Sequence, residues 1–182
     1  MDFCNQSLLD VLDEYGNFTG QRASREEVHK LGLIHRAIHL YLVDEEDHLL
    51  MQKRAKTVDH YPNEWSISLT GHVDAGESSS EALYREVREE LRLDPTTMKF
   101  DFLFSYRQEY TLHESYIDRH FNDVYFCQYS FRLENIHFNT NEVAGLERIP
   151  FKQFKDMVNI KESLISQIYA KEYAGLDYLG LI

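Results

Sequence analysis

The sequence predicts a single α+β domain, and three observations favour this fold class. First, 182 residues with 43% hydrophobic and 13% aromatic content suffice for one domain with a sizeable core. Second, strand-like apolar runs alternate with segments that carry helix-capping signals. Third, the chain contains no internal repeat, low-complexity tract or linker rich in Pro, Gly or Ser. We therefore expect one domain over residues 1–182.

Residues 1–30 predict an N-terminal extension made of a small hairpin and a short helix. Turn signals around Gly16 and Gly20 separate short apolar runs, and a charged piece follows from Arg22 to Lys30. The next apolar runs are rich in aliphatic and β-branched residues and end at polar or acidic turns. They predict three strands, over residues 33–43, 48–54 and 65–69.

The second half of the chain predicts three more strands and a terminal helix. We expect strands over residues 100–106, 121–131 and 143–149, with a polar loop between the first two. After an apolar segment at residues 151–158, a helix is expected over 160–174, followed by a tail. Asn159 would cap this helix, Glu162 would complete a capping box, and Gly175 would stand just beyond its end.

The stretch from Gly71 to Leu93 carries most of the chemical information. Ser78 can cap a helix whose third residue is Glu81, and Asp94 with the following proline would close it. We therefore expect a helix over residues 79–93. Its apolar stripe, which would face the core, consists of Leu83, Val87 and Leu91.

Three carboxylates share one side of this helix. At 100° per residue, Glu86, Glu89 and Glu90 fall within an arc of roughly 100°. Like charges this close repel unless a cation neutralises them, and oxygen ligands in this number suit Mg²⁺ or Mn²⁺, which in turn bind phosphates. Arg85 stands one turn before Glu89 and can pair with it. The alternative is a solvated acidic face with an ordinary ion pair.

Charge and cysteine content narrow the class of partner. A net charge of −12 argues against a nucleic-acid backbone as the main partner, and an acidic protein that handles phosphates needs a metal ion. Cys4 and Cys127 are the only cysteines, so no disulfide framework is expected. The N-terminus lacks a basic region followed by a long apolar run, and no stretch approaches the ~20 apolar residues of a membrane span. We expect a cytoplasmic protein without a membrane partner, and a homodimer stays open.

The spacing of the whole segment resembles the Nudix box. Five residues separate the glycine from the first glutamate, and seven more precede an Arg-Glu pair; an aliphatic residue, one further residue and a Glu-Glu pair follow. The matching positions are Gly71, Glu77, Arg85, Glu86, Glu89 and Glu90. One position departs, because the glycine that follows the glutamate pair is Arg92 here. This departure bears on the geometry of the helix exit rather than on the metal ligands.

The resemblance implies both a fold and a site. Nudix proteins form an α/β/α sandwich with a mixed β-sheet, and the box is a loop, a helix and a second loop. By resemblance, Glu86, Glu89 and Glu90 would hold a divalent metal ion, Mg²⁺ or Mn²⁺, against a diphosphate. Glu77 and Arg85 would brace the box.

Beyond the box, roughly residues 10–155 resemble the Nudix branch related to isopentenyl-diphosphate isomerase. In those isomerases, histidines that match His29, His35 and His72 contribute to a metal site, and a basic residue that matches Arg54 meets the diphosphate. The lysine expected nearby falls on a valine, so Lys56 is its closest substitute. We expect Arg54, Lys56 and His72 to bind the substrate, and His35 to be a further metal ligand. The matching motifs include Val28-His29, His35-Arg36-Ala37, Gln52-Lys53-Arg54, Trp65, Ser68 and Gly71-His72.

Two departures distinguish a hydrolase from an isomerase. Isomerisation needs a proton donor and a proton acceptor, which the family supplies as a cysteine before the Gly-His pair and two glutamates in a later strand. The cysteine position is Thr70 here, and a hydroxyl pKa is too high to replace a thiol. In the later strand Asp123 matches one glutamate, and Phe121 stands at the other position. Both proton-transfer groups are compromised, whereas the metal-bearing helix is whole.

The resulting hypothesis is Mg²⁺-dependent hydrolysis of a phosphoanhydride bond in a small organic diphosphate. The substrate would be a nucleoside diphosphate derivative or an isoprenoid diphosphate. Glu89, or Glu142 from a later loop, would accept the proton of the attacking water. The first alternative is an isomerase-like enzyme, and the second is a non-catalytic domain that senses a diphosphate. The expected catalytic residues are Glu86, Glu89, Glu90 and Arg85.

Overall fold

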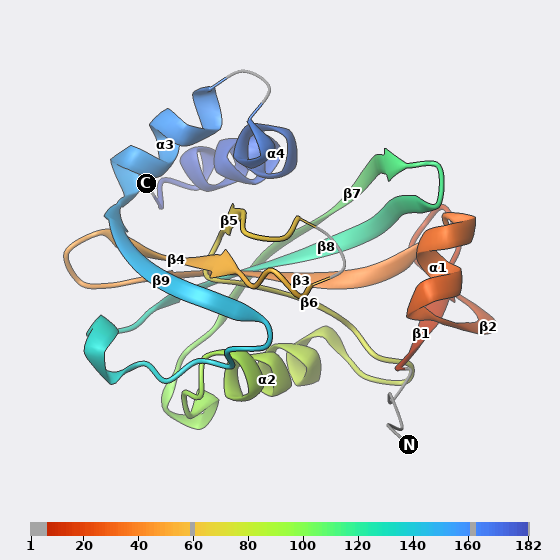
Figure 1. Ribbon diagram of the computed structural model, residues 1–182, viewed down its shortest axis with the longest axis horizontal. Coiled ribbons are helices and arrows are strands. Elements are labelled where there is room, and N and C mark those ends of the chain that lie inside the picture. Colours follow the sequence, from red (N-terminus) through yellow and green to blue (C-terminus); the bar gives the residue numbers. More distant parts are fainter. Residues whose placement is uncertain (1–6, 59–60, 161–162, 182) are drawn as a thin grey trace. The chain divides into compact units, whose positions relative to one another are not determined.

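The computed structural model describes residues 7–58, 61–160 and 163–181, which Figure 1 draws in colour along the chain. The chain divides into two compact units. The first consists of residues 1–39, 70–85 and 102–125, and the second of residues 40–69, 86–101 and 126–182. The prediction of one domain over the whole chain stays a prediction.

Within the described residues, the main sheet has seven strands in the order β5-β4-β3-β8-β7, with β6 paired to β3 and β9 paired to β4. A sheet accompanied by several helices confirms the predicted α+β class. Among these residues no helix is both long and apolar enough to cross a membrane. The strands are β3 (His35–Val43), β4 (His48–Arg54), β5 (Trp65–Ser66), β6 (Leu69–His72), β7 (Asp101–His113), β8 (Tyr116–Gln128) and β9 (Val143–Pro150).

The first unit begins with the predicted hairpin and short helix. Strands β1 (Leu8–Leu12) and β2 (Phe18–Ser24) pair antiparallel, and helix α1 (Arg25–Leu31) follows directly. Ser24 and Glu27 form a complete capping box at the start of α1. Gly32 ends the helix with φ 63°, and a Cβ at this position would meet Ile117 at 3.0 Å, so both conformation and space favour glycine. The expected hairpin and helix are confirmed.

The two long strands of the first unit extend further than their sequence pattern indicates. We expected strands over residues 100–106 and 121–131 with a polar loop between them, and the prediction of this loop is wrong. Strand β7 continues to His113 and β8 begins at Tyr116, so a tight turn joins two strands of 13 residues each. The two strands are neighbours in the sheet, and from Gln108 to His113 exposed residues of β7 alternate with less exposed ones, as in a strand with one face toward solvent.

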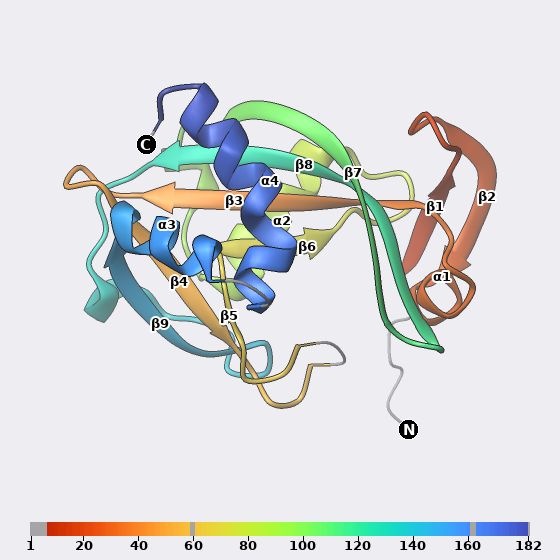
Figure 2. The same ribbon diagram turned by 90° about the horizontal axis from the view of Figure 1, so that it is seen from above.

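The second unit packs helices on both faces of its strands. Helices α3 (Phe151–Asn159) and α4 (Leu164–Tyr178) lie on one side of β4 and β9, and the last turn of α2 (Ser79–Glu90) lies on the other (Figures 1 and 2). Tyr41 and Phe154 are fully buried between the sheet and the helices, with ring centroids 5.9 Å apart. This layering follows the sandwich that the resemblance implies.

The C-terminal helix differs in both of its boundaries from the prediction. Asn159 is the last residue of α3 and not a cap, because Ile160 adopts an extended backbone (φ −72°, ψ 110°) that interrupts the helix. Ser163 caps α4 instead, accepting a hydrogen bond from the Ser166 amide at 3.0 Å. Gly175 lies inside α4, which runs to Tyr178. Glu162 lies outside the described residues.

Helix α2 begins as predicted and ends earlier. Ser78 accepts from the Glu81 amide at 3.3 Å, while Glu81 accepts from the Ser78 amide at 2.8 Å, which confirms the capping box. The helix was expected to reach residue 93 but ends at Glu90. Arg92 has φ 54°, so the chain takes the left-handed conformation at the position where the Nudix pattern has glycine. The stripe of Leu83, Val87 and Leu91 is buried as predicted.

Candidate functional site

In the first unit, the loop before α2 is held by one arginine. Arg85 donates to both carboxylate oxygens of Glu77, from Nε at 3.0 Å and from Nη2 at 2.9 Å, and also donates to the His72 carbonyl at 3.0 Å. Glu77 in turn accepts from the Asp74 amide at 3.1 Å. A bidentate arginine–carboxylate pair fixes direction as well as distance. The structure therefore brings Glu77 and Arg85 together, as the resemblance implied, whereas a pairing of Arg85 with Glu89 stays a prediction.

In the second unit, three carboxylates approach one another at the end of α2. One oxygen each of Glu86, Glu90 and Glu142 lies within 4.8 Å of the others. Glu86 and Glu90 are four residues apart, so they project from the same side of the helix, and both are buried at 8% and 6% exposure. Glu89, the third ligand expected from the sequence, is exposed and is not part of this group. Its role as a ligand stays a proposal.

The loop that carries Glu142 is tied to both sides of the carboxylate cluster formed by Glu86, Glu90 and Glu142. The Asn139 amide donates to the Glu90 carbonyl at 2.9 Å, and the Glu142 carbonyl accepts from the Ala55 amide at 2.8 Å. The Asn139 side chain also donates to the Glu142 carboxylate at 2.5 Å. These bonds link the end of α2, the end of β4 and the loop before β9. The tertiary structure thereby adds Glu142, which the sequence offered only as a candidate base.

The electrostatics of the cluster favour a cation. The pKa of Glu90 is raised to about 8, chiefly by burial and in addition by the negative charges of Glu86 and Glu142. Gln52 opposes this shift by donating from Nε2 to Glu90 Oε2 at 3.2 Å, and the charge of Arg54 also opposes it. A buried carboxylate beside two others binds either a proton or a metal ion. An all-oxygen set of this kind suits a hard divalent cation such as Mg²⁺ or Mn²⁺.

The two predicted basic substrate residues follow the same strand. Arg54 is the last residue of β4 and is half-buried, and its charge acts on Glu90. Lys56 is exposed in the turn after β4. The next residue, Thr57, donates to the Asn141 carbonyl at 2.9 Å, which ties this turn to the loop of Glu142. Arg54 therefore belongs to the surroundings of the cluster, and Lys56 lies in a turn fastened to the same loop.

The first unit contains a second group of metal-ligating side chains. His29, His35 and His72 each offer a ring nitrogen within 4.8 Å of the others, and their ring centroids lie 5.1 to 5.3 Å apart. Burial lowers the pKa of His35 to about 3 and that of His72 well below its ordinary value. The His35 and His72 rings are therefore neutral, which is the form that binds a metal ion. His72, predicted to bind substrate, is grouped here with the two histidines of the expected metal site.

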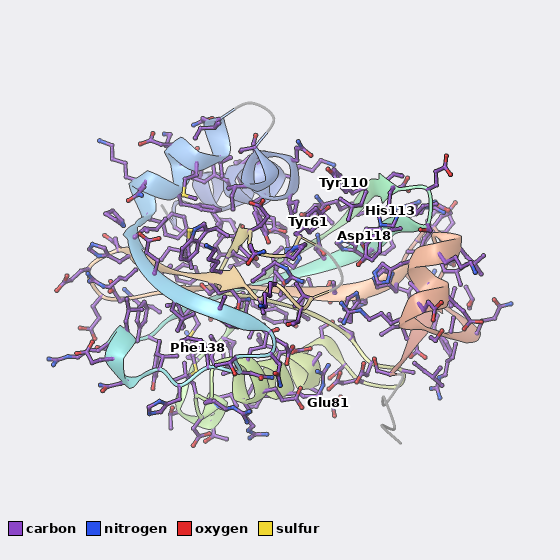
Figure 3. All side chains as sticks on the ribbon, viewed as in Figure 1. Tyr61, Glu81, Tyr110, His113, Asp118 and Phe138 are labelled. Carbon is purple, nitrogen blue, oxygen red and sulfur yellow. The ribbon has the colours of Figure 1, made fainter. Side chains whose placement is uncertain are left out.

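A carboxylate that the sequence did not single out completes this histidine group. Asp118 of β8, labelled in Figure 3, places Oδ1 3.6 Å from His29 Nε2 and 3.9 Å from His35 Nε2. Burial alone would raise the pKa of Asp118, but neighbouring His120 and His29 bring it well below its usual range. Among the described residues, His35 Nε2 and Asp118 Oδ1 are buried without a hydrogen-bond partner. A neutral nitrogen and a charged oxygen left in this state fit a divalent metal ion.

Comparison with known proteins decides the family. The family model described as the NUDIX domain matches residues 33–168, well over half of the chain. The chain belongs to the Nudix family. Nudix hydrolase 3 of Arabidopsis thaliana is 32% identical over 155 residues, which cover 83% of this chain but only 20% of that protein's length. Isopentenyl-diphosphate Delta-isomerase 2 of Photorhabdus laumondii is 27% identical over 171 residues, covering 94% of this chain and 93% of the isomerase.

The fold of this Nudix chain also has solved counterparts. A crystal structure of a Deinococcus radiodurans protein superposes with a TM-score of 0.69 at 22% identity, covering 86% of this chain and 91% of that one. At this identity the likeness speaks for the fold alone. The predicted family and fold class are thus confirmed, and both named relatives are enzymes, which agrees with the prediction of a Nudix-type enzyme.

Both carboxylate oxygens of Asp123 accept hydrogen bonds that the Nudix isomerase pattern does not predict. Arg36 Nη1 donates to Asp123 Oδ1 at 2.8 Å, and the Ser79 hydroxyl donates to Oδ2. Arg36 also donates to the Gly16 carbonyl at 3.2 Å and lies over the Phe121 ring, 5.8 Å from its centroid. Asp123 is 6% exposed, so this ion pair is poorly screened. In the sequence Asp123 matches one of the two isomerase glutamates; in the structure its contacts with Arg36 and Ser79 link β3, the hairpin turn and the first residue of α2.

Cys127 does not supply the thiol that the isomerase pattern has at the position of Thr70. The cysteine is fully buried in β8, and burial raises the pKa of its thiol to about 11. The thiolate needed for proton exchange or nucleophilic attack is therefore scarce at neutral pH. The complete burial of Cys127 is typical of a small core residue.

Proposed function

We propose that this protein is a Nudix hydrolase that uses a divalent metal ion, Mg²⁺ or Mn²⁺, to cleave the phosphoanhydride bond of a small organic diphosphate. The observation that carries the proposal is the carboxylate cluster at the end of the box helix, formed by Glu86 and Glu90 of that helix and Glu142 of a later loop, in a chain that belongs to the Nudix family. A nucleoside diphosphate derivative and an isoprenoid diphosphate both remain candidate substrates. A cytoplasmic location accompanies the proposal and rests on the sequence alone.

The chemistry divides between the metal ion and the side chains around it. When bound, a divalent metal ion neutralises diphosphate charge and lowers the pKa of an attacking water. Glu86, Glu90 and Glu142 would hold this ion, with Glu89 as the additional ligand that the Nudix pattern implies. Arg54 would meet a diphosphate oxygen, and Lys56 would approach from the turn after β4. Glu77 and Arg85 would keep the box loop in place without touching the substrate.

The proton of the attacking water needs an acceptor with access to solvent. Glu89 and Glu142 are exposed, whereas Glu86 and Glu90 are buried. The Asn139 side chain orients the Glu142 carboxylate, which favours it for proton transfer during catalysis. We therefore place the base among these two exposed carboxylates, and Glu142 is the better oriented of the two.

An isomerase is the second candidate, because the Photorhabdus laumondii relative is named as one and matches this chain over 93% of its own length. Two features of this chain oppose it. Thr70 stands where the isomerase pattern has a cysteine, and its hydroxyl does not ionise at physiological pH. Asp123 already accepts hydrogen bonds from Arg36 and Ser79 on its two carboxylate oxygens, which leaves less room for contact with a substrate. A diphosphate sensor without catalysis is the third candidate.

One panel of assays distinguishes the three candidates. Purified protein is incubated with nucleoside diphosphate derivatives and isoprenoid diphosphates in Mg²⁺, in Mn²⁺ and in chelator, and phosphate or monophosphate release is measured. We expect release from at least one substrate with metal and none with chelator. Deuterium exchange into isopentenyl diphosphate without any hydrolysis would instead indicate the isomerase. Metal-dependent binding of a diphosphate without turnover would indicate the sensor.

A further inference from the structure

We propose that Gln52 is a positioning residue of the metal centre: its amide group holds Glu90, and its amide oxygen serves as an acceptor for a water that accompanies the bound ion. This inference rests on the proposed function, because it assumes that the carboxylate cluster binds a metal ion. Gln52 lies in β4, outside the Nudix box. Nothing in the spacing of the box assigns it a role.

The backbone fixes the point from which this side chain starts. Gln52 stands opposite Ser66 of β5 on one side and opposite Leu146 of β9 on the other. A residue with a strand on both sides has little backbone freedom, so the direction of its side chain is set by the sheet. Gln52 is also only 2% exposed, which leaves few alternative rotamers.

One atom of this amide has a partner and the other does not. Nε2 donates to Glu90 Oε2 at 3.2 Å. Among the described residues, Oε1 is a buried atom without a hydrogen-bond partner. Buried amide oxygens in this state are rare, because losing water without gaining a donor is unfavourable. Both atoms belong to one small planar group, so the unpartnered oxygen lies next to the carboxylate that Nε2 holds.

The surroundings of Oε1 indicate what donor is missing. With a metal ion bound the carboxylates are ionised and offer only acceptors, so in that state the cluster cannot supply the hydrogen bond. Magnesium sites usually keep several waters, and each of these waters has protons to donate. Glutamine combines the donor that a ligating carboxylate needs with the acceptor that such a water needs. A glutamate at this position would add a fourth negative charge, and an aliphatic residue would provide neither group.

A purely structural role is the rival explanation. In that case Gln52 only satisfies the buried Glu90 carboxylate, and its removal lowers stability without changing the affinity for metal. Outer partners of metal ligands differ from this, since their loss typically lowers metal affinity by 10- to 100-fold. The two roles are therefore separated by metal affinity and not by activity.

The test compares metal binding in matched variants of the full chain. Gln52→Met and Gln52→Leu remove both polar atoms at similar volume, and Mn²⁺ and Mg²⁺ affinities are measured by isothermal titration calorimetry without substrate. Tyr41→Phe is the control, because it removes one buried hydrogen bond in the same unit, from the Tyr41 hydroxyl to Glu172 at 2.7 Å, and leaves the carboxylates intact. Far-UV circular dichroism and melting temperature without metal confirm that each variant folds.

We expect both Gln52 variants to bind metal about 10 to 100 times more weakly than wild type, and Tyr41→Phe to bind as wild type. In the double variant with Glu90→Gln, the losses should be less than additive, because the two residues act through one contact. Wild-type affinity in a folded Gln52→Met protein would overturn the inference and leave the proposed function standing. Absence of metal binding in the wild-type protein would overturn both.

Discussion

At the scale of single residues, burial distinguishes two kinds of carboxylate on one helix. Glu86 and Glu90 are buried beside the exposed Glu142, while Glu89 faces solvent. The same helix therefore carries two buried carboxylates, whose charge a cation would compensate in the proposed mechanism, and one exposed carboxylate. The distinction is one of environment, because the side chains are chemically identical.

The residue whose removal tests the metal centre most directly is Glu90. Glu90→Gln keeps size and helix propensity while removing one ligand charge, so the fold should survive. We expect kcat on the best diphosphate to fall by roughly 10² to 10⁴. Charge stabilisation by a metal ion lowers the activation free energy by several kcal/mol, and each loss of about 1.36 kcal/mol reduces the rate tenfold. Steady-state kinetics at saturating Mg²⁺ measures this. Unchanged kcat in the folded variant would contradict the role of Glu90 as a metal ligand.

The pKa of Glu90 also predicts how stability depends on pH in the metal-free protein. Burial raises this pKa from 4.5 to about 8, so between these values the folded state holds a proton that the unfolded state has released. The contribution is fully present below pH ~4.5 and is lost as pH rises through ~8, by at most about 1.4 kcal/mol per pH unit. Urea denaturation from pH 5 to 8 in chelator should show this loss. Glu90→Gln should show a weaker dependence, and equal slopes would contradict the assignment.

At the scale of elements, the box helix and the loops around it determine which residues meet. The capping box at Ser78 and Glu81 starts α2, and the left-handed Arg92 ends it. The chain then returns through the loop whose Asn139 amide bonds the Glu90 carbonyl, and this brings in Glu142. The helix exit is thus connected to the cluster by hydrogen bonds and not only by sequence.

The conformation of Arg92 predicts a stabilising substitution. A residue with a Cβ in the left-handed region is strained by about 1–2 kcal/mol, whereas glycine adopts this conformation freely. Part of the gain is lost because glycine is more flexible in the unfolded chain. We expect Arg92→Gly to stabilise the protein by about 0.5–1 kcal/mol in urea denaturation. Arg92→Ala serves as the control and should show no such gain, because alanine keeps the Cβ; an equal gain in both would point to charge instead of backbone strain.

At the scale of the whole molecule, the protein carries a net charge of −12, and the diphosphate proposed as its substrate is also anionic. A bound divalent cation reduces the local negative potential where diphosphate would bind. The same cation would stabilise the folded chain by mass action, because the unfolded chain does not assemble the ligands. The proposed function therefore predicts that activity and stability both depend on metal occupancy.

This linkage predicts a metal-dependent melting temperature. At a free Mg²⁺ concentration 100 times its Kd, the folded state should gain about 2.7 kcal/mol, which differential scanning fluorimetry reads as an upward shift. Chelator should reverse the shift, and Glu90→Gln should show much less of it. Ca²⁺ and monovalent salt at matched ionic strength control for general screening. A shift of the same size in NaCl would indicate relief of charge repulsion rather than a specific site.

The amino-acid sequence by itself determined the family, the order of most elements and the identity of the box residues. These features depend on local spacing, as the capping box at Ser78 and the buried stripe of Leu83 and Val87 demonstrate. Side-chain periodicity and capping act over a few residues, so they can be read without the fold.

Only the tertiary structure decided which residues share a site. Glu142 and Gln52 are remote from the box in sequence and meet Glu90 through the pairing of β4 with β9 and the hydrogen bonds of the Asn139 loop. Asp118 of β8 likewise approaches His29, which is remote from it in sequence, because of the fold. The extent of β7 and β8 and the break between α3 and α4 were also settled by the fold. Each depends on contacts between residues distant in sequence, which no local pattern encodes.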